Sequence, residues 1–513
     1  MKLLKNSLVI GGFTLISRVL GLVRDLFMAA ILGAGPVADA FFAAFRLPNL
    51  FRRVFAEGAF NSAFVPLYAG KLEAEGEEAA DAFAREALAT LLTIVLALVL
   101  VFELSMPFVM SVIATGFLEK PDLFAKAVLY GQITMPYILF MSMTAMFGGV
   151  LNARHKFAAA AAAPVMLNVV LIAVLLSRPA DAQTAALHLS FGVAGSGILQ
   201  AAVVIWGCRM AGVRLGLSLP RLSQSVRRLL WLTVPGAISA GVVQINLVVG
   251  QRFASMQEHA ISWLQYADRL YQMPLGMVGI AMGVALLPGL TRQVRSGDEA
   301  GAREALNEAL QLSTAFTLPA AVALLVLPQL FVEGLFMRGA FGQEDAINTA
   351  AALRIYAIGL PSFILIKVFA PAFFAREDTK TPMIFAAMSM LLNVILCAVL
   401  FSLMGFVGLA LATTLAGWLN AVLLGGHLWV HKRFTPTRAV ASRLLRLIGA
   451  AGIMGGVIVF SAPPLRQLLG DLPWAAFWLA ILVAALGMLA YGASALILGG
   501  VSRREMKAAL RGK

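Results

Sequence analysis

The chain has 513 residues, of which 60% are hydrophobic and 13% charged, and its net charge is +14. Soluble domains carry about 25% charged residues, so a single soluble globule is excluded. The basic residues are scattered between apolar segments rather than gathered in one patch, which argues against a nucleic-acid partner. The composition therefore predicts a polytopic, all-α integral membrane protein.

Apolar segments long enough to cross a bilayer recur along the whole chain. A spanning helix needs about 20 apolar residues. By this measure the sequence predicts about 14 transmembrane helices, at residues 7–33, 37–69, 86–114, 123–151, 157–177, 185–208, 229–255, 260–291, 305–336, 346–374, 382–403, 405–430, 440–461 and 473–500. The first, second and eighth of these segments carry charges that lower their hydropathy.

The loop charges predict the orientation of the chain. Lys and Arg are concentrated in the loops on the side of the two termini, whereas the opposite loops hold only Lys120, Arg178, Arg338 and Arg466. Cytoplasmic loops carry the excess of basic residues in membrane proteins. We therefore expect a multi-pass membrane protein with both termini in the cytoplasm.

The two halves of the chain resemble each other. Ala153-Arg154 and Leu167–Leu171 are echoed by Ala375-Arg376 and Leu392–Leu396. Parallel repeats of this size are typical of transporters. The repeat predicts an N-terminal lobe at 1–222 and a C-terminal lobe at 223–436, each of six helices. Residues 437–513 then add spans 13 and 14 and a basic cytoplasmic tail.

Several predicted spans contain charged residues, which cost at least about 2.5–3.5 kcal/mol each near the centre of a bilayer. They are Arg18, Arg24, Asp25, Asp39, Arg46, Arg52, Arg53, Glu57, Arg252, Asp268 and Arg269. The excess is cationic, and the guanidinium group grips phosphate with two parallel hydrogen bonds. A polar cavity for an anionic, phosphate-bearing substrate is one interpretation. The alternative is that Arg–Asp pairs only fix helix packing, or that Arg46, Arg53 and Arg252 extend toward the membrane surface.

Motifs for other chemistry are missing from the sequence. Cys208 and Cys397 form no CxxC pair, and the five histidines contain no HExxH, so we expect neither a metal site nor a cofactor. No GxxxxGK[ST] or GxSxG motif is present, and we expect a transporter rather than an enzyme. The segment Gly33-Ala34-Gly35 indicates a turn or a close helix contact and not a phosphate loop.

Several motifs resemble those of a known family. Ser17–Asp25, Ala38–Phe41, Phe45–Arg53 and Glu57–Phe60 resemble the N-terminal signature of the MurJ (MviN) lipid II flippases. Tyr266–Leu270, Arg338–Phe341 and Phe374–Pro382 are similar to three further motifs of that family. It belongs to the multidrug/oligosaccharidyl-lipid/polysaccharide exporter superfamily.

The resemblance implies a function in peptidoglycan synthesis and a set of site residues. A lipid-linked disaccharide-pentapeptide pyrophosphate would pass from the cytoplasmic to the periplasmic leaflet by alternating access, with spans 13 and 14 shaping a groove for its polyprenyl tail. Residues important for activity match Arg18, Arg24, Arg52 and Arg269, supported by Asp25, Asp39, Arg53 and Asp268. Gln272 stands where some members carry Glu, so a role for that carboxylate does not transfer to this chain.

The resemblance also sets the expected partners. These are lipid II, membrane lipids and the cell-wall synthesis and division machinery. A cavity rich in Arg would make transport depend on the membrane potential, with a monovalent cation as the other energy source. The alternative function is export of another polyprenyl-linked glycan, or multidrug export, by the same superfamily.

Overall fold

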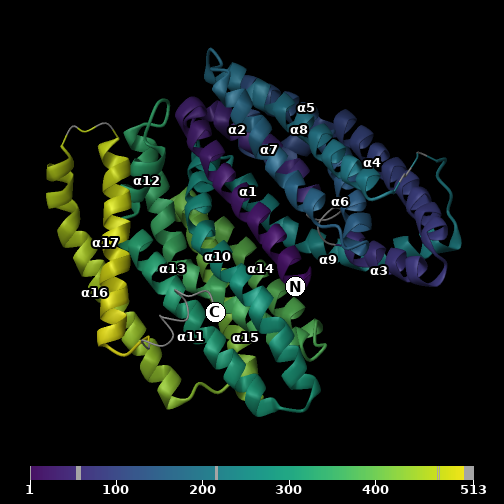
Figure 1. Ribbon diagram of the computed structural model, residues 1–513. Helices are drawn as coiled ribbons and strands as arrows, with labels where there is room; N and C mark the ends of the chain where they lie inside the picture. Colours follow the sequence, from purple (N-terminus) through teal and green to yellow (C-terminus); the bar gives the residue numbers. More distant parts are fainter. Residues whose placement is uncertain are drawn as a thin grey trace. The chain divides into compact units, whose positions relative to one another are not determined.

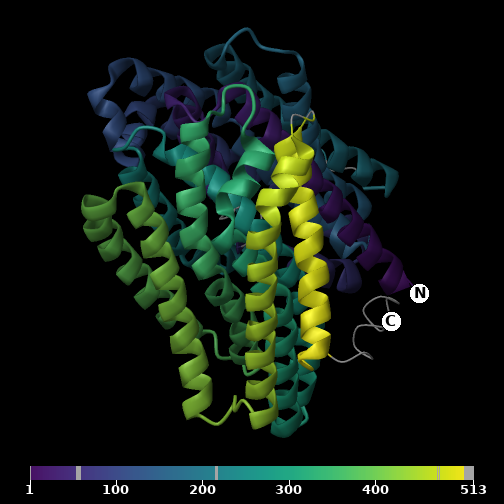
Figure 2. The ribbon, with the colours of Figure 1, turned by 90° about the vertical axis from the view of Figure 1, so that its left-hand side faces the viewer.

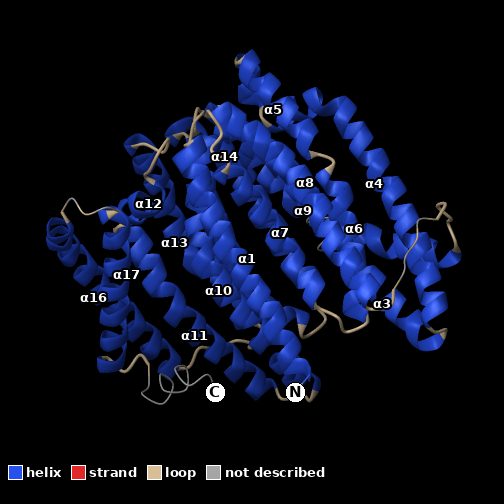
Figure 3. Ribbon diagram, turned by 45° about the horizontal axis from the view of Figure 1, so that its top comes forward, coloured by secondary structure: helices blue, strands red, loops and turns tan. Residues whose placement is uncertain are grey.

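The computed structural model describes residues 2–52, 59–213, 216, 218–470, 472 and 474–501. Across these ranges every regular element is helical and no strand is present (Figure 3). The chain divides into two compact units, described separately below. The first unit comprises Met1–Ser262 and Arg338–Phe341, and the second comprises Trp263–Met337 and Gly342–Lys513.

The first unit contains the helices from the N-terminus to the start of α10, coloured purple to teal in Figure 1. They are α1 (Lys2–Leu32), α2 (Pro36–Phe51), α3 (Ala59–Ala74), α4 (Glu77–Ile113), the 3-10 helix η2 (Thr115–Glu119), α5 (Pro121–Thr134), α6 (Tyr137–Ala153), α7 (Ala158–Leu176), α8 (Ala182–Met210) and α9 (Gln224–Ala254). Helix α10 (Ala260–Arg295) begins in this unit and continues in the second.

The second unit contains the remaining helices. They are α11 (Glu299–Val326), α12 (Pro328–Phe336), α13 (Gln343–Phe374), α14 (Lys380–Met404), α15 (Phe406–Val430), α16 (Arg438–Leu469) and α17 (Ala475–Ile497). Helices α16 and α17 pack side by side, as the two views of Figures 1 and 2 agree. Gly487 permits this approach, because a Cβ there would lie 2.9 Å from Cγ2 of Ile458.

Each predicted span coincides with one helix or with two consecutive helices. Ten stretches of the described chain are long and apolar enough to cross a membrane. The other four predicted spans correspond to α1, the α2–α3 pair, α9 and α10. The all-helical membrane fold is confirmed, whereas the number fourteen stays a prediction.

Helix boundaries follow local chemistry. Side chains of Asp181, Asp298 and Thr437 accept hydrogen bonds from backbone N–H groups in the first turns of α8, α11 and α16. Such caps satisfy donors that have no partner inside the helix. The hydrogen bond from the Thr184 backbone lowers the pKa of Asp181, in accordance with this role. Within predicted span 123–151, Pro136 lacks the N–H needed to continue a helix and separates α5 from α6.

The internal repeat is visible inside each unit. In the first unit α8 packs against α6 and α7, and in the second α15 packs against α13 and α14. The repeated sequences Leu167–Leu171 and Leu392–Leu396 lie on α7 and α14, which hold equivalent positions in the two packings. The first compact unit also includes α9. The predicted lobe boundaries at 222 and 436 rest on the sequence repeat, whereas the two units are defined by their compactness. The boundaries therefore stay predictions.

An ion pair recurs at the same place in both halves. Arg154, after the end of α6, binds Glu77 at the start of α4 at 3.2 Å, and Arg376, after α13, binds Glu299 at the start of α11 at 2.5 Å. The partners are 77 residues apart in both cases. A cation at a helix C-terminus and an anion at an N-terminus both complement the helix dipole.

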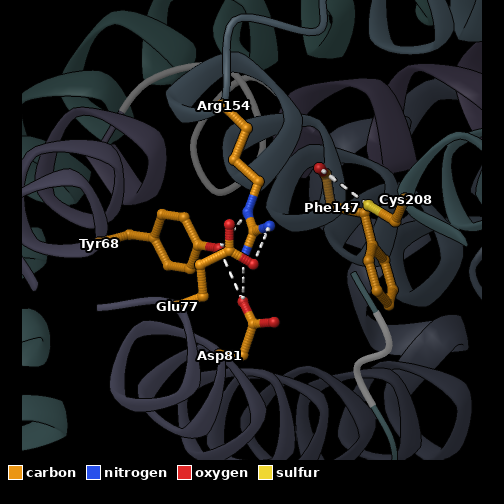
Figure 4. A network of polar contacts seen from close by, with 6 residues as sticks. All are labelled: Tyr68, Glu77, Asp81, Phe147, Arg154 and Cys208. Atoms are coloured by element: carbon orange, nitrogen blue, oxygen red, sulfur yellow. Dashed lines mark hydrogen bonds and ion pairs between the residues drawn. The ribbon is translucent and has the colours of Figure 1, made fainter. Parts of the chain in front are cut away.

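The pair in the first unit belongs to a larger network, shown in Figure 4. Arg154 also donates to Asp81 at 2.9 Å and to the hydroxyl of Tyr68 at 2.9 Å, and that hydroxyl donates to Asp81 at 2.7 Å. The Arg154 side chain is only 10% exposed. The network therefore ties α3, α4 and the end of α6 into one body.

We predict that the two arginines differ in their contribution to stability. Arg154→Met removes three side-chain partners and leaves Asp81 without its cation, so the free energy of unfolding should fall by about 2–3 kcal/mol. The matched variant Arg376→Met breaks an ion pair whose acid is half exposed and should cost at most about 1 kcal/mol. Unfolding of the purified protein in mixed micelles measures both. Equal losses of unfolding free energy in the two variants would contradict this prediction.

Candidate functional site

The first group of predicted site residues lies where α1 contacts α7. Arg24 donates to Oδ1 of Asp25 through Nε at 3.0 Å and Nη2 at 2.7 Å, and to Oδ1 of Asn168 through Nη1 at 3.0 Å. Arg24, Asp25 and Asn168 are all at most 6% exposed. Nδ2 of Asn168 donates to the backbone oxygen of Ser17 at 2.9 Å, so α7 holds α1 at two points.

This arrangement brings Arg24 and Asp25 together as an internal pair. Three of the five N–H donors of Arg24 form hydrogen bonds within the fold. This is the arrangement expected if the Arg–Asp pair fixes helix packing rather than binds a substrate. Asn168 is not among the site residues that the charge pattern of the sequence predicts. Its signal was an amide side chain within an otherwise apolar span, at a position that the repeat duplicates as Asn393.

Arg18 has a different environment from Arg24. It lies on α1 nearly two turns before Arg24, its side chain is exposed, and it makes no hydrogen bond or ion pair with any other described residue. An arginine keeps its charge in every environment that proteins provide. Arg18 is therefore a cation whose donors are not used by any residue that the structure describes.

The two ends of α2 hold the next candidates. Arg52, half-buried at the end of α2, donates from Nε to Asn49 at 3.3 Å. Asp39, only 1% exposed, accepts from the backbone N–H of Ser262 at 2.8 Å and from the Ser262 hydroxyl at 2.5 Å. Because Ser262 is in the first turn of α10, the carboxylate stabilises the N-terminus of that helix. Arg53 and Glu57 lie outside the described residues.

The remaining candidates lie on α10 in the second unit. Asp268 and Arg269 are both half-buried. The amide of Gln272, one helical turn after Asp268, donates a hydrogen bond to its carboxylate. An ionised Glu at this position would have no proton to donate, so this hydrogen bond requires the amide.

The Arg338–Phe341 motif packs against the end of α1 in the first unit. The backbone N–H of Ala340 donates to the oxygen of Ala30 at 2.8 Å. Gly33 and Gly339 both adopt positive φ, and a Cβ on either would lie within 2.6 Å of a backbone oxygen across the contact. The prediction that Gly33-Ala34-Gly35 makes a turn or close helix contact is confirmed.

The second unit contains a large groove among α11, α12, α16 and α17, with a volume of about 1430 Å³. Its middle is apolar and includes Phe316, Met454, Ile458 and Val483. This exceeds the volume of typical pockets for small molecules, which is about 300–1,000 Å³. The two helices that the sequence predicts as spans 13 and 14 thus line part of this groove.

Comparison with solved structures defines the class of this fold. A multidrug resistance MATE family transporter of the MOP superfamily, in an inward-facing conformation, aligns with a TM-score of 0.64 over 81% of this chain and 94% of its own. Its sequence identity is 15%, so this likeness concerns the fold alone. The chain has the fold of this class of multi-pass helical transporters.

Comparison with protein families places the chain in a narrower group than its fold does. Residues 28–469 match the family Lipid II flippase MurJ. Proteins named probable lipid II flippase MurJ from Rhizobium meliloti (strain 1021) and Rhizobium tropici are 46% and 44% identical, over 99% of this chain and 97% of theirs. A structure of lipid II flippase MurJ in an inward closed conformation aligns with a TM-score of 0.79 and 27% identity, covering 96% of this chain and 98% of that chain.

The chain belongs to the lipid II flippase MurJ family. The resemblance stated from the motifs is confirmed, as is the expectation of a transporter rather than an enzyme. The protein is accordingly a multi-pass protein of the bacterial inner membrane.

The glycine contact at the end of α1 gives a prediction. Gly33→Ala forces a side chain into a positive φ and against the Ala340 oxygen, so the free energy of unfolding should fall by at least about 1–2 kcal/mol. Gly35→Ala is the matched control, because Gly35 has an ordinary φ of −93° and open space around its Cβ position. Thermal unfolding of both variants tests this. A Gly33→Ala variant as stable as the control would contradict it.

Proposed function

We propose that the protein moves lipid II from the cytoplasmic to the periplasmic leaflet by alternating access, with Arg18, Arg24, Arg52 and Arg269 binding the pyrophosphate. Asp25, Asp39, Arg53 and Asp268 support them. The observation that carries this proposal is the match, over nearly the whole chain, to relatives named as lipid II flippases. Both termini lie in the cytoplasm.

The charge of the substrate explains why arginines are kept in apolar helices. A guanidinium group forms paired hydrogen bonds to phosphate oxygens. Its positive charge also offsets the high energetic cost of placing a diphosphate in the bilayer. Arg18 supports this role most directly because it is exposed and no described residue occupies its donors. Arg24 would first have to exchange Asp25 for a phosphate oxygen, which replaces one anionic partner with another.

Asp25, Asp39 and Asp268 limit repulsion among the arginines before the substrate binds. Asp39 also fixes the start of α10, on which Arg269 is carried. Asp39 thus has two roles in this proposal: it balances arginine charge and fixes the position of α10.

The polyprenyl tail occupies the apolar groove among α11, α12, α16 and α17 in this proposal. Arginines that bind an anion in a cavity also give the membrane potential a charge to act on, at about 2.3 kcal/mol per elementary charge and 100 mV. We propose the potential as the energy source, with a monovalent cation as the alternative, and the cell-wall synthesis and division machinery as further partners.

Export of another polyprenyl-linked glycan is the alternative function. Such an exporter would use the same arginines and the same groove, and its substrate would differ from lipid II only in the sugar. The fold shared with MATE transporters does not argue for a cationic drug as substrate, because the identity is 15%. The excess of arginines opposes a cationic cargo.

Rescue of cells depleted of the native protein tests the proposed role of Arg18. We expect Arg18→Ala to lower the periplasmic exposure of lipid II at least about tenfold, because one charge-assisted phosphate contact contributes about 1.5–3 kcal/mol. Arg18→Lys should recover part of the activity, since it keeps the charge but loses the planar fork. Arg24→Ala, Arg52→Ala and Arg269→Ala complete the series.

The control is Arg209→Ala, which removes an exposed arginine at the end of α8. The membrane level and melting temperature of each variant separate misfolding from loss of transport, above all for Arg24. If well-folded Arg18→Ala cells expose lipid II normally, Arg18 does not act on the substrate.

A further inference from the structure

One cation in an apolar helix of the second unit is not used by the candidate site. Lys367 lies on α13, seven residues before this helix ends at Phe374, which corresponds to about 10 Å along the helix axis. Its side chain is exposed and makes no hydrogen bond or ion pair with any other residue that the structure describes. Charged residues within membrane spans are rare, and they mark the paths of ions and charged substrates.

The packing of α13 shows which way Lys367 faces. The ring of Phe363, one turn before Lys367, has its centroid 5.6 Å from that of Tyr271 on α10. Tyr356, two turns before Phe363, contacts the same Tyr271 ring at 4.8 Å. Spacings of four and seven residues place side chains on one face of a helix. Lys367 therefore lies on the face of α13 that is turned toward α10, the helix that carries Arg269.

The opposite face of α13 is the one that presents large apolar side chains to lipid. Ile347 and Ile358 are 50% and 44% exposed, and they lie three turns apart on one face. Ile358 and Lys367 are separated by two and a half turns, so their side chains point in opposite directions. A lysine on the lipid face can extend along the lipid to the membrane surface. Lys367 is on the other face, where its exposure shows that α13 is open at this level.

Lys367 and Arg269 stand at different depths in the second unit. The orientation predicted from loop charges makes α10 and α13 both run toward the cytoplasm. Lys367 is four residues beyond Phe363, which places it about 6 Å nearer the cytoplasmic end than the ring contact with Tyr271. Arg269 is two residues before Tyr271, about 3 Å on the other side of that contact. A charged group that enters from the cytoplasm thus reaches the level of Lys367 before that of Arg269.

The chemistry of a lysine fits an early contact with an anion. Its ammonium group is compact and strongly hydrated, and it offers three donors on a flexible stem. It attracts an anion over a distance, but it lacks the planar fork with which an arginine holds a phosphate. A substrate can therefore exchange a lysine for an arginine and gain hydrogen bonds by doing so.

We propose that Lys367 is the entry contact for the diphosphate of the cargo, which it binds on the cytoplasmic side before Arg269 does. This inference rests on the proposed function, which supplies the diphosphate and its cytoplasmic origin. It makes the affinity for the diphosphate depend on Lys367, whereas the affinity for the apolar tail does not.

Chemical labelling of the whole purified protein tests the position of Lys367. The variants are Lys367→Cys and, as the matched control on the opposite face, Ile358→Cys. The natural Cys208 and Cys397 are 1% and 2% exposed, so they should not react in the folded protein. We expect a charged, water-soluble maleimide to label the Lys367→Cys variant at least about tenfold faster than the control, because a thiol reacts as its thiolate and lipid disfavours that form. Equal labelling rates would overturn the proposal.

Binding measurements on the whole protein in micelles test the ligand. The probes are a prenyl diphosphate and the uncharged prenyl alcohol of the same chain length. We expect Lys367→Gln to weaken diphosphate binding roughly fivefold and to leave alcohol binding unchanged, since one exposed charged contact is lost. Lys367→Arg should bind the diphosphate at least as well as the native chain. The matched control Lys380→Gln removes an exposed lysine at the start of α14 and should change neither affinity.

The outcomes separate this inference from the proposed function. If Arg18→Ala reduces the preference for the diphosphate but Lys367→Gln does not, the entry contact alone is wrong. If the native chain binds both probes equally, no cation of the chain acts on the diphosphate and both proposals are wrong. An equal loss of both probes in Lys367→Gln, with a lower melting temperature, would show a structural role and overturn the proposal. If this variant weakens the retention of phosphatidylglycerol as much as that of the prenyl diphosphate, Lys367 binds membrane phosphates in general and the proposal is wrong.

Discussion

The cost of placing a charge in a bilayer is the constraint on which this structure depends. Arg24 is tolerated in α1 because Asp25 and Asn168 occupy its donors, and Asp39 is tolerated in α2 because it caps the start of α10. These contacts do two things at once: they neutralise polar groups and they fix which helices touch. Arg18 is outside this scheme, since it is exposed and no described residue neutralises it. In the proposed function, the anionic pyrophosphate of the cargo is the partner of Arg18.

The repeat shows how a transporter of this kind is built from two similar halves. Glu77–Arg154 and Glu299–Arg376 are the same ion pair with the same spacing, and both connect helix ends whose dipoles they complement. The first copy also includes Tyr68 and Asp81, whereas Arg376 in the second also donates to the backbone oxygen of Ala372. In each half, the ion pair joins helix ends that lie 77 residues apart in the sequence.

Hydrophobic length predicted nearly all of the fold, because a helix that spans lipid must satisfy its own backbone and therefore needs a long apolar run. The predicted span 123–151 lies within one candidate membrane span, Pro121–Ala153, although the helix is interrupted at Pro136. The candidate site was less predictable, since a sequence shows that Arg18 and Arg24 lie in one apolar helix but not that one is exposed and the other enclosed. That difference depends on Asn168, more than a hundred residues away.

In the proposed function, the protein moves lipid II across the membrane and its arginines bind the pyrophosphate. Vesicles containing only the purified protein and lipid II in one leaflet test it most directly, with the arrival of lipid II in the other leaflet followed over time. The account predicts transfer well above that of protein-free vesicles, a rate at least about tenfold lower for Arg18→Ala, and an unchanged rate for Arg209→Ala. Transfer that equals the protein-free rate, or that is as fast with Arg18→Ala as with the native chain, would contradict it.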